Sequence, residues 1–250
     1  MTLYVGTSGF AYKEWKPDFY PAGLRQREWL GYYSSTLGSC EINATFYRLQ
    51  SPETIARWGA ETPGRFRFSL KMHRRITHAR ALAPGEGARD LLKAFFDSAG
   101  RLGDKLGVVL LQFPPHRARD DEALAALIDA LPSDRRYAFE FRNETWDRDG
   151  VRERIAAAGG TVCLSNTDGK APDALPPGDL AYVRLRTDEY APDQRDAWKE
   201  LLLSEGSRRD VFAFAKHEGI PAGNPFGGVG LARWLAEVAA GQATQPRGDS

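Results

Sequence analysis

The 250-residue sequence is poor in the features that mark several specialised protein classes. Its only cysteines, Cys40 and Cys163, each lie on the apolar face of a strand-like run, which predicts buried reduced thiols rather than a disulfide framework. The formal net charge of +1 predicts no bulk attraction to nucleic acid or to anionic membranes. No apolar run approaches the roughly 20 residues of a membrane span, and the N-terminus enters a strand without a leader pattern. These absences predict a cytoplasmic protein that does not enter a membrane.

Motifs for metal and nucleotide chemistry are also missing. There are four histidines but no His-x-His, no His-Glu-x-x-His and no cysteine cluster. The phosphate-loop spacing and the serine nucleophile elbow are absent as well. We therefore predict no cofactor, while a divalent metal held by convergent histidine and glutamate side chains stays open.

What the sequence does contain is a regular succession of strand and helix patterns. Eight strand-like runs stand at Leu3–Ser8, Cys40–Phe46, Arg65–Met72, Val108–Phe113, Tyr137–Arg142, Thr161–Asn166, Ala181–Arg186 and Val211–Lys216. Helical patterns between them cover Gln26–Leu37, Pro52–Ala60, Ala88–Leu102, Glu122–Leu131, Val151–Ala158, Pro192–Leu203 and Leu231–Ala240. The Pro- and Gly-rich stretch Thr167–Asp179 is predicted to form a loop.

Eight strands alternating with nearly eight helices predict an α/β fold, a (β/α)8 TIM barrel. We expect one domain over residues 1–241 and a disordered C-terminal tail at 242–250. The sequence leaves the oligomeric state open.

Several of these strands alternate polar and apolar residues, although a parallel strand covered on both faces is usually apolar throughout. In a barrel the apolar set must meet the surrounding helices, so the polar set is predicted to face the barrel axis. The polar positions are Tyr4, Ser8, Glu41, Asn43, Thr45, Arg67, Ser69, Lys71, Gln112, Glu140, Arg142, Arg184 and Arg186.

Five of these positions are cationic and two are carboxylates. An unpaired buried charge is costly, so the excess of positive charge has two interpretations. One is a structural network of ion pairs. The other is an anion-binding active site at the C-terminal mouth of the barrel, where barrel enzymes keep their chemistry.

The predicted loops at that mouth favour the anion site. The basic loop after the third strand contains His73 and His78, and Tyr12 and Trp146 supply aromatic rings. The last strand runs into Lys216-His217-Glu218 and then into a Gly-rich turn before a helix, a common place for phosphate in barrels.

The sequence resembles the YecE-like family, a domain family of unknown function whose members are similar to TIM barrels. The matching motifs are Gly6-Thr7-Ser8-Gly9-Phe10 with Tyr12 and Trp15, Phe19-Tyr20-Pro21, Glu41-Ile42-Asn43-Ala44-Thr45-Phe46-Tyr47, Phe66-Arg67-Phe68 with Lys71, Ile76-Thr77-His78, Leu111-Gln112-Phe113-Pro114-Pro115, Phe139-Glu140-Phe141-Arg142 with Trp146, and Tyr182-Val183-Arg184-Leu185. The resemblance implies the barrel fold and no particular reaction.

The leading hypothesis is an enzyme acting on an anionic substrate: a phosphate ester, a phosphosugar, a nucleotide or a nucleic-acid end. A phosphoester hydrolase is favoured, with Glu41 or Glu140 as general base and His78 or His217 as general acid. The predicted substrate-binding residues are Ser8, Tyr12, Asn43, Lys71, Gln112, Arg142, Trp146, Arg184, Arg186 and Lys216. One alternative is a glycosidase or sugar isomerase that uses the Glu41/Glu140 pair. Another is a non-catalytic module that binds anions or nucleic acid.

Overall fold

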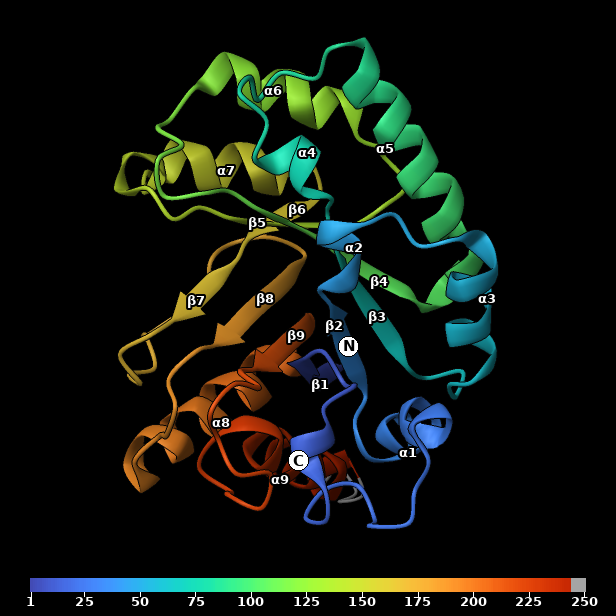
Figure 1. The fold of residues 1–250 in the computed structure, drawn as a ribbon. Helices are drawn as coiled ribbons and strands as arrows, with labels where there is room; N and C mark the ends of the chain where they lie inside the picture. Colours follow the sequence, from blue (N-terminus) through green and yellow to red (C-terminus); the bar gives the residue numbers. More distant parts are fainter. Residues whose placement is uncertain (244–250) are drawn as a thin grey trace. The chain divides into compact units, whose positions relative to one another are not determined.

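The computed structural model describes residues 1–243, in which strands and helices alternate along the chain (Figure 1). The nine strands are hydrogen-bonded in the order β6-β5-β4-β3-β2-β1-β9-β8-β7, and the β1–β9, β3–β4, β4–β5 and β5–β6 ladders are parallel. Their bounds are β1 Leu3–Ser8, β2 Ser39–Ile42, β3 Arg67–Lys71, β4 Leu106–Gln112, β5 Tyr137–Glu140, β6 Gly160–Val162, β7 Leu164–Asn166, β8 Leu180–Leu185 and β9 Asp210–Ala215.

The α-helices are α1 Trp29–Thr36, α2 Ala44–Tyr47, α3 Pro52–Ala60, α4 Arg74–Thr77, α5 Glu86–Ala99, α6 Asp121–Ala130, α7 Asp149–Ala157, α8 Pro192–Gly206 and α9 Gly228–Ala243. Short 3₁₀ helices cover Lys13–Trp15, Gln26–Glu28, Gly100–Lys105 and Glu144–Trp146. Helix α3 has the predicted bounds because Ser51 accepts from the Thr54 N–H as N-cap and Pro52 takes the first helical position. The stretch Thr167–Asp179 contains no helix, as predicted.

Two of the predicted strands differ from the observed ones by more than a shift of one or two residues at an end. The sixth is split at Cys163 into β6 and β7, which stand at the two ends of the strand order. The second ends at Ile42 rather than Phe46, because Asn43 takes helical dihedral angles and Ala44–Tyr47 forms the helical turn α2. The Thr45 hydroxyl donates to the carbonyls of Ile42 and Lys71, and such local bonds compete with a strand ladder.

The described residues group into two compact units, each made of segments that are distant in sequence. Unit 1 contains Met1–Cys40, Ser165–Ala174 and residues 183–243. Unit 2 contains Glu41–Leu164 and Leu175–Tyr182. One domain over residues 1–241 stays a prediction.

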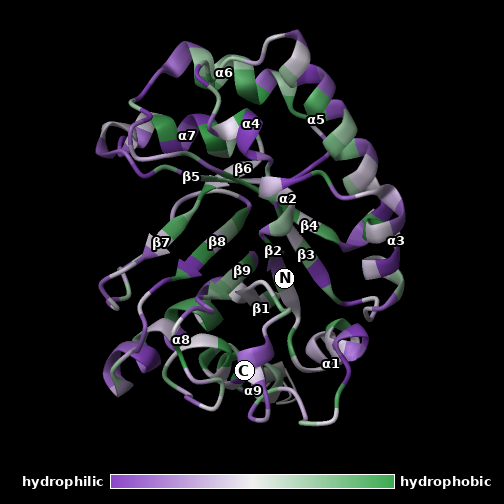
Figure 2. Ribbon diagram, in the orientation of Figure 1, coloured by the Kyte–Doolittle hydropathy of each residue, from purple (hydrophilic) through white to green (hydrophobic). Residues whose placement is uncertain are grey.

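In unit 2 the apolar faces of the strands pack on helices, as the alternation predicts. Phe68 of β3 stacks on Trp58 of α3, with ring centroids 6.4 Å apart, and α7 packs on β6. Helix α5 carries both hydrophobic and hydrophilic residues along its length (Figure 2), which is the pattern of a helix with one buried side.

In unit 1, α9 packs on β1 and β9, and α8 packs on β9. An aromatic cluster around the fully buried Tyr33 fills the space between the first loop and α1, with Trp15, Phe19 and Tyr20 in ring contact. Both Cys40 and Cys163 are buried and are not joined in a disulfide, as predicted.

None of the helices in residues 1–243 is long and apolar enough to cross a membrane. Of the predicted tail, residues 242 and 243 belong to α9, and residues 244–250 lie outside the described part of the chain.

Candidate functional site

In unit 2, the predicted polar residues of β3, β4 and β5 share one face of the strands. Gln112 is paired in register with Glu140, and Lys71 is paired with Leu110, two residues before Gln112. Because side chains alternate along a strand, Lys71, Gln112 and Glu140 point to the same side. All three stand at the last position of their strands, the end at which α/β proteins bind ligands.

Lys71 is a buried cation, with 8% of the residue exposed. Its ammonium donates to Gln112 Oε1 at 2.6 Å and lies over the ring of Phe46, 4.2 Å from the centroid. The aromatic face offers a cation some attraction without a negative charge. The β3 end therefore presents positive charge within a largely apolar wall.

In the side-chain amide of Gln112 the oxygen has a hydrogen-bond partner and the nitrogen has none among the described residues. Lysine has only donors, so the Lys71 contact fixes the Gln112 oxygen toward the ammonium and the Nε2 atom away from it. Gln112 is 5% exposed, and Nε2 is fully buried with no hydrogen-bond partner among the described residues. A buried donor left without an acceptor costs about 1–3 kcal/mol. Lys71 Nζ and Gln112 Nε2, which we call the donor pair, are thus suited to an acceptor-rich ligand.

Asn43 contributes a hydrogen-bond acceptor rather than a donor. Its Oδ1 is buried and makes no hydrogen bond among the residues that the structure describes. The residue itself follows β2 directly and is half-buried. An unpaired acceptor is suited to a ligand hydroxyl rather than to an anion.

Glu41 is held by a residue that the sequence analysis left out of the site. Its carboxylate accepts from the Tyr182 hydroxyl at 2.8 Å, and Tyr182 also lies 2.7 Å from the Ser69 hydroxyl. All three are essentially inaccessible to solvent. A carboxylate only accepts, so Tyr182 donates to Glu41 and Ser69 donates to Tyr182. In β8, Tyr182 lies two residues before Arg184 and so shares its polar face, a signal that its largely apolar ring hid.

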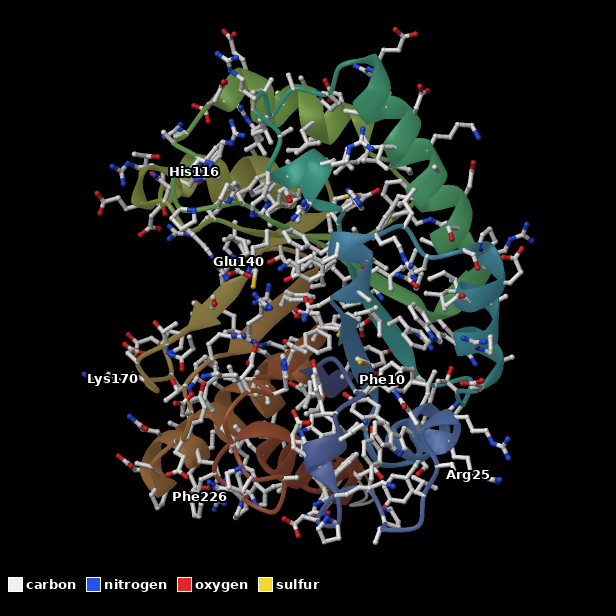
Figure 3. All side chains as sticks on the ribbon, in the orientation of Figure 1. Phe10, Arg25, His116, Glu140, Lys170 and Phe226 are labelled. Carbon is white, nitrogen blue, oxygen red and sulfur yellow. The ribbon has the colours of Figure 1, made fainter. Side chains whose placement is uncertain are left out.

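Glu140, labelled in Figure 3, is buried. It pairs with Arg142, whose Nε lies 3.2 Å from Oε1. Arg142 follows the end of β5, and its side chain is 48% exposed. Trp146 is instead fully packed: it stacks on Phe141 at 4.4 Å, and its indole N–H donates to the Arg117 carbonyl. Trp146 therefore positions the loop after β5.

His78 lies in a cationic environment on the loop after β3. Burial lowers the pKa of its imidazole, and the positive charges of Lys71, His116, Arg142 and Arg117 lower it further. The ring stands edge-on to Phe46, and Nδ1 lies 3.0 Å from the Thr77 hydroxyl. At neutral pH His78 is thus a neutral imidazole surrounded by cations.

A surface pocket of about 530 Å³ adjoins His78. Its lining residues are Phe46, Arg74, Arg75, His78 and Ala79. The pocket therefore combines an aromatic wall, an imidazole and two guanidinium groups.

In unit 1, the predicted cations meet carboxylates from neighbouring loops. Arg186 lies 3.6 Å from Glu218 and donates to the Ser8 hydroxyl at 3.2 Å, while Lys216 pairs with Asp188. Arg184 is almost fully buried in β8. Most of the positive charge predicted for this end of β8 and β9 is therefore neutralised within the unit.

His217 stacks on Tyr12 with ring centroids 4.1 Å apart, and its Nδ1 lies 3.5 Å from the Glu218 carboxylate. Burial raises the pKa of Glu218. A backbone hydrogen bond and the positive charges of His217, Arg186 and Lys216 outweigh that effect, so the pKa is lowered overall. Tyr12 donates to the Ser8 carbonyl, which fixes the ring beneath the imidazole.

Two further predicted features make local contacts in the structure. Arg67, predicted to face the axis, donates to the carbonyls of Gly64 and Phe66 at the start of β3. In the Gly-rich turn, a Cβ on Gly227 would collide with the Asp188 carbonyl and one on Gly230 with that of Asn224. The glycines thus permit close packing of the loops.

Among the described residues, no three histidine, cysteine, aspartate or glutamate side chains come together as metal ligands. Glu41, Glu140 and His78 belong to unit 2 and His217 to unit 1. The structure thus divides the predicted catalytic residues between the two units.

Comparison with known proteins places the chain in a family. Residues 4–247 match the model of the family described as "Protein of unknown function DUF72". The protein YunF of Bacillus subtilis is 31% identical over 149 residues, 58% of this chain and 52% of its own length. YecE of Escherichia coli is 28% identical over 158 residues, 63% of this chain and 54% of its own length. The chain thus spans about half the length of the curated relatives it matches.

Solved structures show the same fold. A DUF72 family protein of Thermotoga maritima has a TM-score of 0.75 at 22% identity, covering 96% of this chain and 100% of its own. One from Enterococcus faecalis has a TM-score of 0.69 at 17% identity, covering 96% and 98%. With the strand order, these likenesses confirm the predicted α/β barrel fold. The chain belongs to the DUF72 family of proteins of unknown function, as the resemblance to YecE-like proteins predicted.

Proposed function

We propose that unit 2 carries the active site of an enzyme that cleaves phosphate esters, and that the donor pair holds the phosphate. The observation that carries the proposal is Gln112 Nε2, a buried donor that has no acceptor within residues 1–243, on an amide already bound to the Lys71 ammonium. Phosphate oxygens are strong acceptors, and a charge-assisted bond from Lys71 is stronger than a neutral one. Arg142, exposed at the end of β5, supplies a further cation.

The acid and base roles follow from the surroundings of each group. Glu140 stands beside Gln112 in the β4–β5 register, so we assign it as the base that takes a proton from the attacking water. Glu41 is bound to Tyr182 and serves as a fixed negative charge. His78 is neutral in the free protein because of the cations around it. A bound dianion offsets these charges, so His78 takes up a proton and can donate it to the leaving oxygen.

In this reaction the water oxygen forms a bond to phosphorus as the ester P–O bond breaks. One proton passes from water to Glu140, and one passes from His78 to the departing alcohol. Inorganic phosphate and the alcohol are the products. The residues of unit 2 thus supply positioning, charge and both proton transfers.

The test replaces Gln112 by Glu. This variant keeps an acceptor for Lys71 and the shape of the side chain, and it turns the unpaired donor into a negatively charged oxygen. We expect phosphate to raise the melting temperature of the wild type more than chloride does at matched ionic strength, since a ligand of the native state stabilises it by linkage. In Gln112→Glu this phosphate-specific rise should disappear, although the fold persists.

The matched control is Gln26→Glu, which adds the same charge at an exposed position in unit 1. It should keep the full phosphate response. Equal protection of the wild type by phosphate and chloride, or an unchanged response in Gln112→Glu, would refute the phosphate site.

A further inference from the structure

We propose that the pocket formed by Phe46, Arg74, Arg75, His78 and Ala79 binds a second phosphate-like group of the same substrate, so that the substrate is a small bis-anionic molecule. This inference rests on the proposed function, because it takes the donor pair as the place of the first phosphate. It adds a second anion site and defines the substrate class.

The charge of the pocket is the first support. Arg74 and Arg75 both line it, and neither guanidinium has an ion pair or side-chain hydrogen bond among the described residues. A guanidinium group matches a phosphate group with two parallel hydrogen bonds. Two such groups beside one pocket favour a dianionic occupant over a neutral one.

The pocket wall is ordered by its own hydrogen bonds. The Nδ1 atom of His73 accepts from the Arg75 N–H at 3.1 Å, and the His78 N–H donates to the Arg74 carbonyl at 2.7 Å. Burial lowers the pKa of His73, and the charges of Arg75 and Arg74 add to this effect, so the ring stays neutral and able to accept. The arginines therefore project from a fixed turn.

The pocket and the donor pair share a wall. Phe46 lines the pocket, its ring lies under the Lys71 ammonium, and the His78 ring lies nearly perpendicular to it at 5.0 Å between centroids. One molecule that spans Phe46 can therefore place one anionic group near Lys71 and another near Arg74 and Arg75. Joining the two groups covalently makes the second contact intramolecular, which raises affinity without any new contact.

The size and lining of the pocket also indicate what kind of chain joins the two anionic groups of the substrate. A volume of about 530 Å³ accommodates a small molecule rather than a single ion. Phe46 and Ala79 add apolar surface to the lining, which suits a short carbon chain. The substrate class is thus a phosphate ester with a second terminal phosphate-like group a few carbons away.

The experiment measures binding of alkane bisphosphonates of increasing chain length by calorimetry, each against the alkyl monophosphonate of equal length. The intact chain is used throughout. We expect one intermediate length to bind at least about tenfold more tightly than its monophosphonate, with weaker gains at shorter and longer lengths. The double variant Arg74→Gln/Arg75→Gln should lose this gain and keep its monophosphonate affinity.

The control variant Arg27→Gln/Arg101→Gln removes the same charge from two exposed positions and should keep the gain. Monophosphonate binding without any bisphosphonate gain would overturn the second site alone and leave the proposed function standing. A wild type that binds neither ligand would overturn the proposed function. Tighter binding of a 5′-phosphorylated dinucleotide than of every bisphosphonate would assign the site to nucleic-acid ends and overturn the small-molecule substrate.

Discussion

The two units treat their cations differently at the ends of their strands. In unit 1, Arg186 meets Glu218 and Lys216 meets Asp188. In unit 2, Arg142 meets Glu140, but other cations lack such partners. Arg74 and Arg75 line a pocket without carboxylate partners among the described residues. Beside Lys71, the buried Gln112 Nε2 has no acceptor in that part of the chain.

This difference in ion pairing distinguishes two interpretations of the basic residues in the sequence. Basic residues at strand ends were compatible with a structural network and with an anion site, and the predicted loops favoured the anion site. In unit 1, ion pairs with carboxylates from the loops after β8 and β9 favour the interpretation as a structural network. In unit 2 the unsatisfied Gln112 Nε2 lies on an amide bound to the Lys71 ammonium, and this combination of a free donor with a cation favours an anion site there.

The largest expected effect comes from replacing one carboxylate in each unit and comparing the rates of the two variants. Glu140→Gln should lower the rate of phosphate-ester cleavage by about 10²–10⁴-fold, the usual contribution of a general base. Its phosphate-dependent rise in melting temperature should persist, because the isosteric amide keeps the site's shape. Glu218→Gln in unit 1 is the matched change, and we expect it to leave the rate within a few-fold of wild type. Steady-state kinetics on a series of phosphate monoesters measures both.

Phosphate binding without turnover on any monoester would contradict the catalytic role and leave a non-catalytic anion-binding module. A larger rate loss in Glu218→Gln than in Glu140→Gln would move the chemistry to unit 1.

The sequence predicted the barrel fold and much of the polar face, because alternation and strand–helix succession are local properties. Lys71, Gln112 and Glu140 share a face as expected. The end of β2 could not be predicted in this way, since alternation continues through Thr45 while its hydroxyl turns the chain through a bond to Lys71, 26 residues away.

The charge balance of each site could not be read from alternation either. It depends on loop carboxylates such as Asp188 and Glu218, whose partners are set by tertiary structure. The role of Tyr182 was missed for a related reason: only its hydroxyl reveals the link to Glu41, and that link joins residues 141 positions apart.

A smaller effect is expected from removing one buried tyrosine hydroxyl in each unit. Tyr182→Phe takes a hydrogen bond from the Glu41 carboxylate and should lower the free energy of unfolding by about 1.5–3 kcal/mol, as for bonds to charged groups. Tyr190→Phe takes one from the neutral Asn166 amide and should cost about 0.5–1.5 kcal/mol. Urea denaturation of both variants measures the difference. Equal losses would show that Glu41 is not held as a carboxylate by Tyr182.

The smallest expected effect is the pH dependence of anion binding, which sharpens the contrast through one histidine. The pKa of His78 is lowered in the free protein, so the unfolded chain takes up a proton at this site before the folded chain does. As the pH decreases below the ordinary value of about 6.5, the free energy of unfolding therefore decreases. A bound dianion raises that pKa, so anion binding takes up a proton and strengthens as pH falls. Sulfate, which stays a dianion, should therefore bind more tightly at about pH 6 than at about pH 8, by about tenfold for each unit of pKa change. Calorimetry should show the trend lost in His78→Gln and kept in His217→Gln. A trend that persists in His78→Gln would place the titrating group elsewhere and remove His78 from the proposed mechanism.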